Sequence, residues 1–251
     1  MKKILTTAIL CAGLVGFTAC DSFLDEEPKS SLTLDTYYKT SADIIGNVNY
    51  LYRDGAPDKM GNMTGAYRGS SLSVMNMVTG YFVNEYEGQE VDCSYARQLT
   101  RQNFTQSCCN YLTNDTWKGC YKSINVANAV IKYVDGVEMD NQAQYKAEAR
   151  FFRALNYFYL VKMFGDVPMV TEPTEDATLV EYPTRTAASE VFNTVIIPDL
   201  QFAVENLPNA TFAGNSHRVT KYAADMLLAD VYMRLGEYAN AVTPLKDVIN
   251  S

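Results

Sequence analysis

Apolar residues recur at helical spacing in the middle of the chain, and they predict a helix over residues 117–134. Its apolar face carries Trp117, Tyr121, Ile124, Asn128 and Ile131, separated by four, three, four and three positions. Asn114 or Asp115 stands where an N-cap belongs, and Asp135-Gly136 is typical of a helix end. Because Asn128 falls on the apolar face, its amide is predicted to be buried and to hydrogen-bond a neighbouring helix or loop backbone.

A second long helix is predicted over 143–164. Its apolar residues spread around more than one face, so other helices are expected to surround it. Arg150 and Arg153 interrupt the pattern. If they are buried with the rest, their charges need carboxylate partners. Gly165 stands at the expected end, and Pro168 opposes continuation of the helix.

Weaker patterns fill in the flanking segments. Helical spacing of Ile44 or Ile45, Val48 and Tyr52 predicts a helix over 41–53. The segment 171–184 contains two prolines and is predicted to be a loop, and 209–218 is a polar loop. A helix returns over 187–207, where Pro198 is expected to kink or break it.

The last segment has the spacing of a helical repeat. The residues that match the tetratricopeptide pattern are Leu228, Ala229, Tyr232, Gly236, Tyr238, Ala241, Leu245 and Val248. Gly236 allows the chain to reverse, and Ala241 allows two helices to approach closely. One repeat cannot bury its own face, so we expect it to stack on the helices at 117–134 and 143–164. The prediction is an all-α fold of tetratricopeptide-like helical pairs, packed as a bundle or solenoid with long irregular loops.

Composition and charge narrow the function classes. The 251 residues are 47% hydrophobic and 20% charged, which is typical of a globular chain, and the net charge of −8 argues against nucleic-acid binding. His217 is the only histidine, which argues against a multi-histidine metal centre. No glycine-rich phosphate loop is present, and a pair of carboxylates among 29 acidic residues carries no signal for a glycosidase. We therefore expect no catalytic residues, no cofactor and no metal.

The amino terminus predicts export. Lys2 and Lys3 precede an apolar run over 4–19, which is marginal for spanning a bilayer and is typical of a secretory signal. Phe17-Thr18-Ala19-Cys20 resembles a lipobox, although Phe17 replaces the usual Leu, and Cys20 is the predicted lipid-attachment site. A plain cleaved signal is the alternative. The predicted organisation is a signal peptide over 1–19, a lipidated acidic tether over 20–34 and a helical domain over 35–251.

The remaining cysteines are Cys93, Cys108, Cys109 and Cys120. No two of them form a CxxC pair, which argues against zinc. An exported protein can form disulfides, and Cys93 could pair with Cys108 or Cys109. Free buried thiols and one disulfide both stay open.

Five motifs in order resemble the SusD/RagB family of nutrient-uptake outer-membrane lipoproteins. They are Cys20 with Phe23-Leu24-Asp25 and Pro28; Trp117-x-x-x-Tyr121-x-x-Ile124 with Ala127-Asn128; Ala147-Glu148-Ala149-Arg150-Phe151-Phe152-Arg153-Ala154 running into Phe164-Gly165-Asp166-Val167-Pro168; Asp199-Leu200 with Leu207-Pro208; and Arg218-x-Thr220-Lys221-x-Ala223-Ala224 running into the repeat-like hairpin. Each motif alone is weak, but the ordered set behind a lipobox is specific.

The resemblance implies a non-enzymatic protein that faces the cell exterior, anchored in the outer membrane by lipid. Such proteins bind oligosaccharides, or in some cases peptides, and deliver them to a SusC-like TonB-dependent transporter. Members are typically about twice this length, so we expect the sequence to be the amino-terminal part of a longer protein. The runner-up function is a protein-interaction scaffold of the tetratricopeptide type, and an enzyme acting on glycans is a distant third.

Sugar binding needs flat aromatic faces for the ring and amides or carboxylates for the hydroxyls. In this family such residues tend to come from loops before the Trp117 helix. The candidate ligand-binding residues are Tyr81, Asn84, Tyr86 and Tyr95. The alternative is that these tyrosines are ordinary half-buried packing residues. Trp117 itself lies on a regular helical face, so it is predicted to belong to the core.

Overall fold

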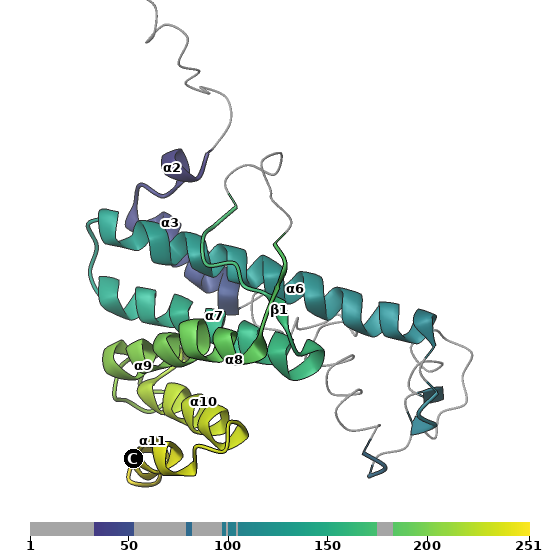
Figure 1. The fold of residues 1–251 in the computed structure, drawn as a ribbon. Helices are drawn as coiled ribbons and strands as arrows, with labels where there is room; N and C mark the ends of the chain where they lie inside the picture. The colour runs from purple at the N-terminus through teal and green to yellow at the C-terminus, as the bar shows by residue number, and fades with distance from the viewer. Residues whose placement is uncertain (1–32, 53–78, 82–96, 99, 104, 175–182) are drawn as a thin grey trace, which may run out of the picture. The chain divides into compact units, whose positions relative to one another are not determined.

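The computed structural model describes residues 33–52, 79–81, 97–98, 100–103, 105–174 and 183–251. These residues are mostly helical, as the sequence predicts, and contain one short antiparallel strand pair (Figure 1). The chain divides into two units after Tyr37, and in the described residues of the first unit α2 (Leu34–Tyr37) is a single helical turn. The second unit, residues 38–251, holds all the other elements. No helix in the described ranges is long and apolar enough to cross a membrane.

The predicted helix near residue 41 is confirmed as α3 (Ser41–Tyr50). It begins with a capping box, in which the Asp43 N–H donates to Thr40 Oγ1 at 3.4 Å and the Thr40 N–H donates to Asp43 Oδ2 at 2.8 Å. The Thr40 hydroxyl and the Thr40 N–H both donate to Asp43 Oδ2, and these two bonds lower the pKa of the Asp43 carboxyl. Ile44 and Val48 are fully buried, so the predicted apolar face is the packed one.

The two long helices are α6 (Gln106–Tyr133) and α7 (Gln142–Phe164). The 3₁₀ turn η3 (Val134–Gly136) ends α6 where Asp135-Gly136 predicts it. The predicted N-cap at Asn114 or Asp115 is wrong, because α6 has already begun at Gln106. No Gly or Pro stands between 106 and 116, so nothing interrupts the helix there. Gly165, with φ 68°, takes the left-handed conformation that ends α7.

The predicted helix over 187–207 has three parts: α8 (Ala188–Val191), the π-helical turn η4 (Phe192–Ile196) and α9 (Ile197–Asn206). Pro198 stands in the first turn of α9, where its missing N–H is tolerated. The N–H of Ile197 bonds to the carbonyl of Phe192, five residues back. The expected break at Pro198 is therefore a single widened turn rather than an interruption.

The repeat-like hairpin is confirmed as α10 (Lys221–Arg234) and α11 (Tyr238–Ile249), joined at Gly236 with φ 76°. Leu228, Ala229 and Ala241 are buried. Figure 1 shows the elements stacked in chain order, with α7 against α6, α9 against α7, α10 against α9 and α11 against α10. The expected stacking of the hairpin on 117–134 is therefore wrong, because the apolar face of α9 takes that place.

One small sheet joins the ends of the connection between α7 and α8. Strands β1 (Val167–Pro168) and β2 (Arg185–Thr186) pair antiparallel, with Val167 opposite Thr186 and Pro168 opposite Arg185. The predicted loop over 171–184 is neither helix nor strand at residues 171–174 and 183–184, and its remainder lies outside the described residues.

Candidate functional site

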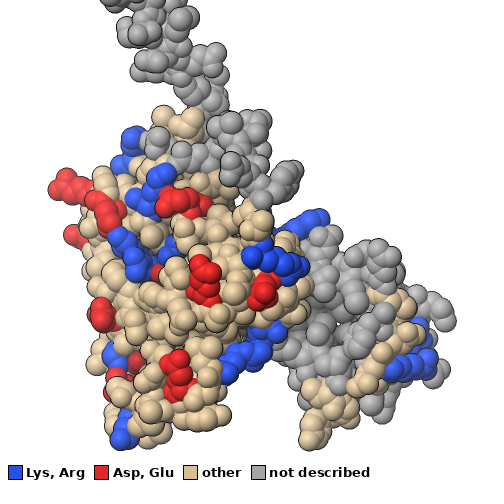
Figure 2. Space-filling model, viewed as in Figure 1, with Lys and Arg blue, Asp and Glu red and all other residues tan. Residues whose placement is uncertain are grey.

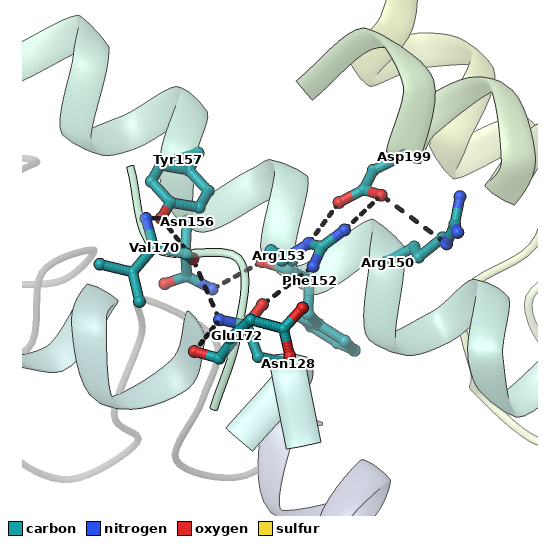
Figure 3. A network of polar contacts seen from close by, with 9 residues as sticks. All are labelled: Asn128, Arg150, Phe152, Arg153, Asn156, Tyr157, Val170, Glu172 and Asp199. Carbon is teal, nitrogen blue, oxygen red and sulfur yellow. Dashed lines mark hydrogen bonds and ion pairs between the residues drawn. The ribbon is translucent and has the colours of Figure 1, made fainter. Parts of the chain in front are cut away.

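A buried polar cluster lies where α6, α7 and α9 meet, and Arg153 of α7 is at its centre (Figure 3). Arg153 Nε donates to Asp199 Oδ2 at 2.6 Å, and Nη2 donates to Asp199 Oδ1 at 2.9 Å. The remaining nitrogen, Nη1, donates to Asn128 Oδ1 at 2.9 Å. Arg150 adds a longer ion pair, with 3.8 Å between its Nε and Asp199 Oδ1. The prediction that both arginines need a carboxylate is confirmed, and one aspartate serves both.

Burial and ion pairing have opposite effects on the charged form of Asp199. Burial raises the pKa of the Asp199 carboxyl, while the hydrogen bonds from Arg153 and the charge of Arg150 oppose that rise. The Arg150 guanidinium also lies over the ring of Phe202, 4.2 Å from its centroid. Both cations are thus held by partners of this chain, and the cluster serves packing between helices.

The segment after β1 is held by side chains of α6 and α7. Asn128 Nδ2 donates to the carbonyls of Val170 at 3.0 Å and Glu172 at 3.2 Å (Figure 3). The Tyr157 hydroxyl donates to the Val170 carbonyl at 2.8 Å and accepts from the Val170 N–H at 2.6 Å. The prediction that the buried Asn128 amide bonds loop backbone is therefore confirmed.

Two further side chains of α6 contact the same segment. The Tyr121 hydroxyl donates to the Pro168 carbonyl at 2.7 Å, and Asn125 Oδ1 accepts from the Thr174 N–H at 2.7 Å. The polar groups of α6 that could recognise a foreign peptide backbone here bind residues 168–174 of the chain itself.

A second buried cluster joins α3, α7 and the start of α10. Glu148 is fully buried, and it accepts from Arg218 Nε at 3.0 Å and from Nη2 at 2.5 Å. The Tyr52 hydroxyl donates to Glu148 Oε2 at 3.0 Å and accepts from the Val219 N–H at 2.9 Å. Burial opposes the charge of Arg218, but the bonds to Glu148 raise its pKa overall. This cluster fixes residues distant in the chain against one another.

The polar loop over 209–218 leads into that cluster. Ser216 (φ 51°) and His217 (φ 62°) are consecutive non-glycine residues in the left-handed region. The His217 N–H donates to the Phe212 carbonyl at 2.9 Å, and the two rings meet edge to face at 5.2 Å. His217 thus has a role in shaping the loop.

Of the predicted ligand-binding residues, the structure describes Tyr81. Its side chain is 90% exposed, and it follows Gly80, which has φ 79° in a tight turn. Tyr81 is thus exposed rather than half-buried in the described residues, and its contact with a ligand stays a prediction. Asn84, Tyr86 and Tyr95 lie outside the described residues, as does Cys20.

Trp117 is half-buried rather than a full core residue. Its ring packs against Tyr121 at 5.0 Å and Phe164 at 5.1 Å between centroids. The Arg185 guanidinium lies 5.7 Å from the Trp117 ring centroid. Trp117 therefore anchors the junction of α6, the end of α7 and β2.

The cysteines are described at one position. Cys120 is a buried free thiol, and burial raises its pKa to about 12. The side chains of Cys93, Cys108 and Cys109 lie outside the description. Among the described residues no group of three or more His, Cys, Asp or Glu side chains could hold a metal ion. Figure 2 shows acidic and basic side chains interspersed over the visible face, without a patch of one sign.

The sequence reasoning missed the pairing of Glu148 with Arg218 and Tyr52. A signal was present, because Glu148 stands between Ala147 and Ala149 in a helix expected to be surrounded. A carboxylate in such a place needs a cationic partner. The partner comes from seventy positions away, and no local pattern indicates it.

The described helices stack in chain order, an architecture that this chain shares with the solved proteins named below. Residues 22–233 match the SusD-like family model described as "Starch-binding associating with outer membrane". The match covers most of the chain, so the protein belongs to the SusD-like family.

Individual relatives agree. A SusD-like protein of Formosa agariphila, P2, is 29% identical over all of this chain and 47% of its own length. A solved laminarin-binding SusD-like protein is 25% identical with a TM-score of 0.68, over 84% of this chain and 44% of its own. A SusD-like carbohydrate-binding protein of Bacteroides fragilis has the same fold at 21% identity, with a TM-score of 0.68 over 86% of this chain and 41% of its own. The chain spans between 40% and 47% of the length of the curated relatives it matches.

Proposed function

We propose that this protein is a surface-exposed outer-membrane lipoprotein that binds oligosaccharides and delivers them to a SusC-like TonB-dependent transporter. The observation that carries the proposal is the match of residues 22–233 to a family described as starch-binding at the outer membrane. A solved neighbour whose name states laminarin binding supports a glycan as the ligand class. Cys20, at the end of the apolar leader, is the proposed site of lipid attachment.

The proposed contact residues are Tyr81, Asn84, Tyr86 and Tyr95. Tyr81 supports this assignment because its ring is 90% exposed on a tight turn, where a pyranose can stack on it. The proposed role is binding without cleavage. Peptide in place of glycan is the alternative cargo.

An interaction scaffold is the second candidate, and the geometry favours it less. Such a function would use polar side chains on the helical face to bind a partner's backbone. In this chain Tyr121, Asn125 and Asn128 already bind residues 168–174. A partner would have to displace the protein's own segment.

The test of ligand binding is titration calorimetry of the purified chain with starch, laminarin and other oligosaccharides, and with a peptide mixture as control. Saturable binding of at least one glycan without hydrolysis products is expected. Binding of peptides alone would replace the glycan with peptide cargo. Release of sugar fragments would overturn the non-enzymatic assignment.

Two cellular experiments test anchoring and partnership. Labelling with a palmitate analogue is expected for the wild type and absent for Cys20→Ser, and added protease should reach the protein on intact cells. Affinity purification from gently solubilised membranes is expected to recover a large TonB-dependent barrel. Recovery without any barrel would remove the delivery step from the proposal.

A further inference from the structure

The polar loop between α9 and α10 has a strained backbone near its end. Ser216 and His217 have φ values of 51° and 62°, and left-handed residues other than glycine rarely stand in succession. The His217 N–H donates to the Phe212 carbonyl, five residues back, at 2.9 Å. This is the hydrogen bond of a Schellman motif, in which Ser216 occupies the position that glycine usually takes. The loop therefore keeps a strained conformation without the residue that would relieve it.

Side chains of the loop and of the buried cluster beside it hold this conformation. Thr211 Oγ1 accepts from the backbone N–H three residues on at 3.1 Å, and Asn215 Nδ2 donates to the Val219 carbonyl at 2.9 Å. Arg218 is bound to the buried carboxylate of Glu148. Strained backbone persists only where its surroundings enforce it, and it is concentrated at active sites, ligand-binding sites and switch regions.

The side chain that this loop presents is Phe212. It is 58% exposed, and its ring meets the His217 ring edge to face at 5.2 Å between centroids. No Asp, Glu, Lys or Arg stands between positions 209 and 217, although the whole chain has a net charge of −8. A single exposed apolar residue is ordinary on a protein surface. A ring fixed by a strained backbone and by a second ring is instead pre-organised for a contact.

The chemistry of the loop favours a protein surface over a glycan. A sugar subsite needs polar side chains beside the ring to bind the hydroxyls. The side chains of Thr211 and Asn215 bind backbone of this chain instead. Rigid aromatic side chains that enter an apolar recess contribute much of the affinity of protein–protein contacts.

We propose that Phe212 is the anchor of a protein–protein contact, in which its ring enters an apolar recess of the partner. This inference rests on the proposed function, which supplies a SusC-like transporter as that partner. Because positions 209–217 carry no Asp, Glu, Lys or Arg, the affinity should depend little on salt. A second copy of the chain is the weaker partner, since each copy has a net charge of −8 and the copies would repel one another.

The test measures the dissociation constant of the purified chain for the transporter that co-purifies with it, by biolayer interferometry in detergent. Phe212→Ala is expected to raise this constant about 10-fold or more. Ala213→Ser changes the neighbouring exposed residue and should leave the constant within about twofold of wild type. Calorimetric titration of Phe212→Ala should give the glycan affinity of the wild type.

The outcomes separate this contact from the proposed function. A barrel bound equally well by wild type and Phe212→Ala would overturn the contact and leave the proposed function standing. If no barrel co-purifies with the wild type, the delivery step fails and the contact fails with it. Weaker glycan binding by Phe212→Ala would assign the ring to a sugar subsite instead. A concentration-dependent dimer that Phe212→Ala dissociates would assign it to a second copy.

Hydrogen exchange of the His217 amide shows whether the loop keeps its shape in the variant, because that amide bonds to the Phe212 carbonyl. If the amide exchanges faster in Phe212→Ala, Phe212→Leu takes its place. Leucine keeps an apolar side chain beside His217 and removes the flat ring, so the dissociation constant is expected to rise about 3-fold or more. An unchanged constant for Phe212→Leu with an intact loop would equally overturn the contact.

Discussion

Arg218 holds the carboxylate of Glu148 through three hydrogen bonds of 2.5–3.0 Å, although seventy positions separate the two residues. The bond from Tyr52 to the same carboxylate brings α3 into the contact. The start of α10 is thereby fixed to the middle of α7 and the end of α3. This contact therefore sets the path of the chain from the polar loop into the repeat-like hairpin.

Replacing Glu148 with Ala is expected to lower the free energy of unfolding by about 3–5 kcal/mol. The change removes the acceptor of Arg218 and leaves a partly buried cation without its carboxylate. Urea unfolding followed by circular dichroism measures the loss. Glu205→Ala is the matched control, because Glu205 is exposed on α9, and its effect should stay within about 0.5 kcal/mol.

The double variant Glu148→Leu with Arg218→Met tests how much an unpaired Arg218 destabilises the fold. Removing both charges avoids the unpaired cation, so the double variant should be more stable than Glu148→Leu alone. Equal stability of the single and double variants would mean that Arg218 left without its carboxylate does not destabilise the fold.

Tyr157→Phe is expected to release the segment after β1 locally. The Val170 N–H loses its acceptor, while the Val170 carbonyl keeps its bond from Asn128. We expect about 1–2 kcal/mol of destabilisation and faster exchange of the Val170 amide, measured by NMR. Tyr232→Phe is the control, because its hydroxyl makes an exposed bond of 3.2 Å with Gln201. Unchanged exchange at Val170 would mean that Tyr121, Asn125 and Asn128 hold the segment without the Tyr157 hydroxyl.

The buried thiol of Cys120 predicts a loss of stability at alkaline pH. Its pKa rises from 9.0 to about 12 on folding because burial disfavours the thiolate. Between these values the unfolded chain has lost a proton that the folded chain keeps, so the free energy of unfolding falls as pH rises above about 9. Below pH 9 the thiol is protonated in both states, so the free energy of unfolding no longer changes with pH through Cys120.

The measurement is urea unfolding of wild type and Cys120→Ala at pH 8, 9 and 10. The variant is less stable at every pH because of the cavity, but its stability should fall less steeply above pH 9, by up to about 1 kcal/mol per pH unit. Parallel curves would show that Cys120 ionises equally in both states.

Tyr81→Ala is expected to weaken glycan binding about 3- to 10-fold, which corresponds to the loss of one aromatic stacking contact of roughly 0.5–1.5 kcal/mol. The melting temperature should stay unchanged because Tyr81 is 90% exposed. Calorimetric titration with the best-bound glycan gives the affinity. Phe212→Ala removes another exposed ring and serves as control. Equal affinity of Tyr81→Ala and wild type would remove Tyr81 from the site.

The sequence predicts a feature of the helices well where one residue, or a few neighbouring residues, determine it. The ends of α7 and the turn between α10 and α11 follow from Gly165 and Gly236, both in left-handed backbone. The buried arginines of α7 imply a carboxylate, and Asp199 supplies it. Such inferences succeed because each depends on the physical chemistry of one residue.

Features that depend on distant partners escape prediction. The two-residue strands β1 and β2 are too short to show alternation. Helix α6 begins earlier than its apolar stripe, since a helix needs only the absence of a breaker to continue. In the candidate site Tyr81 is exposed, and its contact with a ligand remains a prediction, as do those of Asn84, Tyr86 and Tyr95.

The widened turn η4 sets how far the side chains of α9 are rotated about the helix axis. Because the hydrogen bond of this turn reaches back five residues instead of four, its five residues rotate the helix about as far as four α-helical residues, and Asp199 and Leu200 lie about 100° from the positions they would take in an uninterrupted α-helix of the same length. That rotation aims Asp199 at Arg153 and Leu200 at the core. If all five residues of η4 took ordinary α-helical turns, every side chain of α9 would rotate by that amount and Asp199 would turn away from Arg153. The number of residues in this turn therefore decides which side of α9 faces α7.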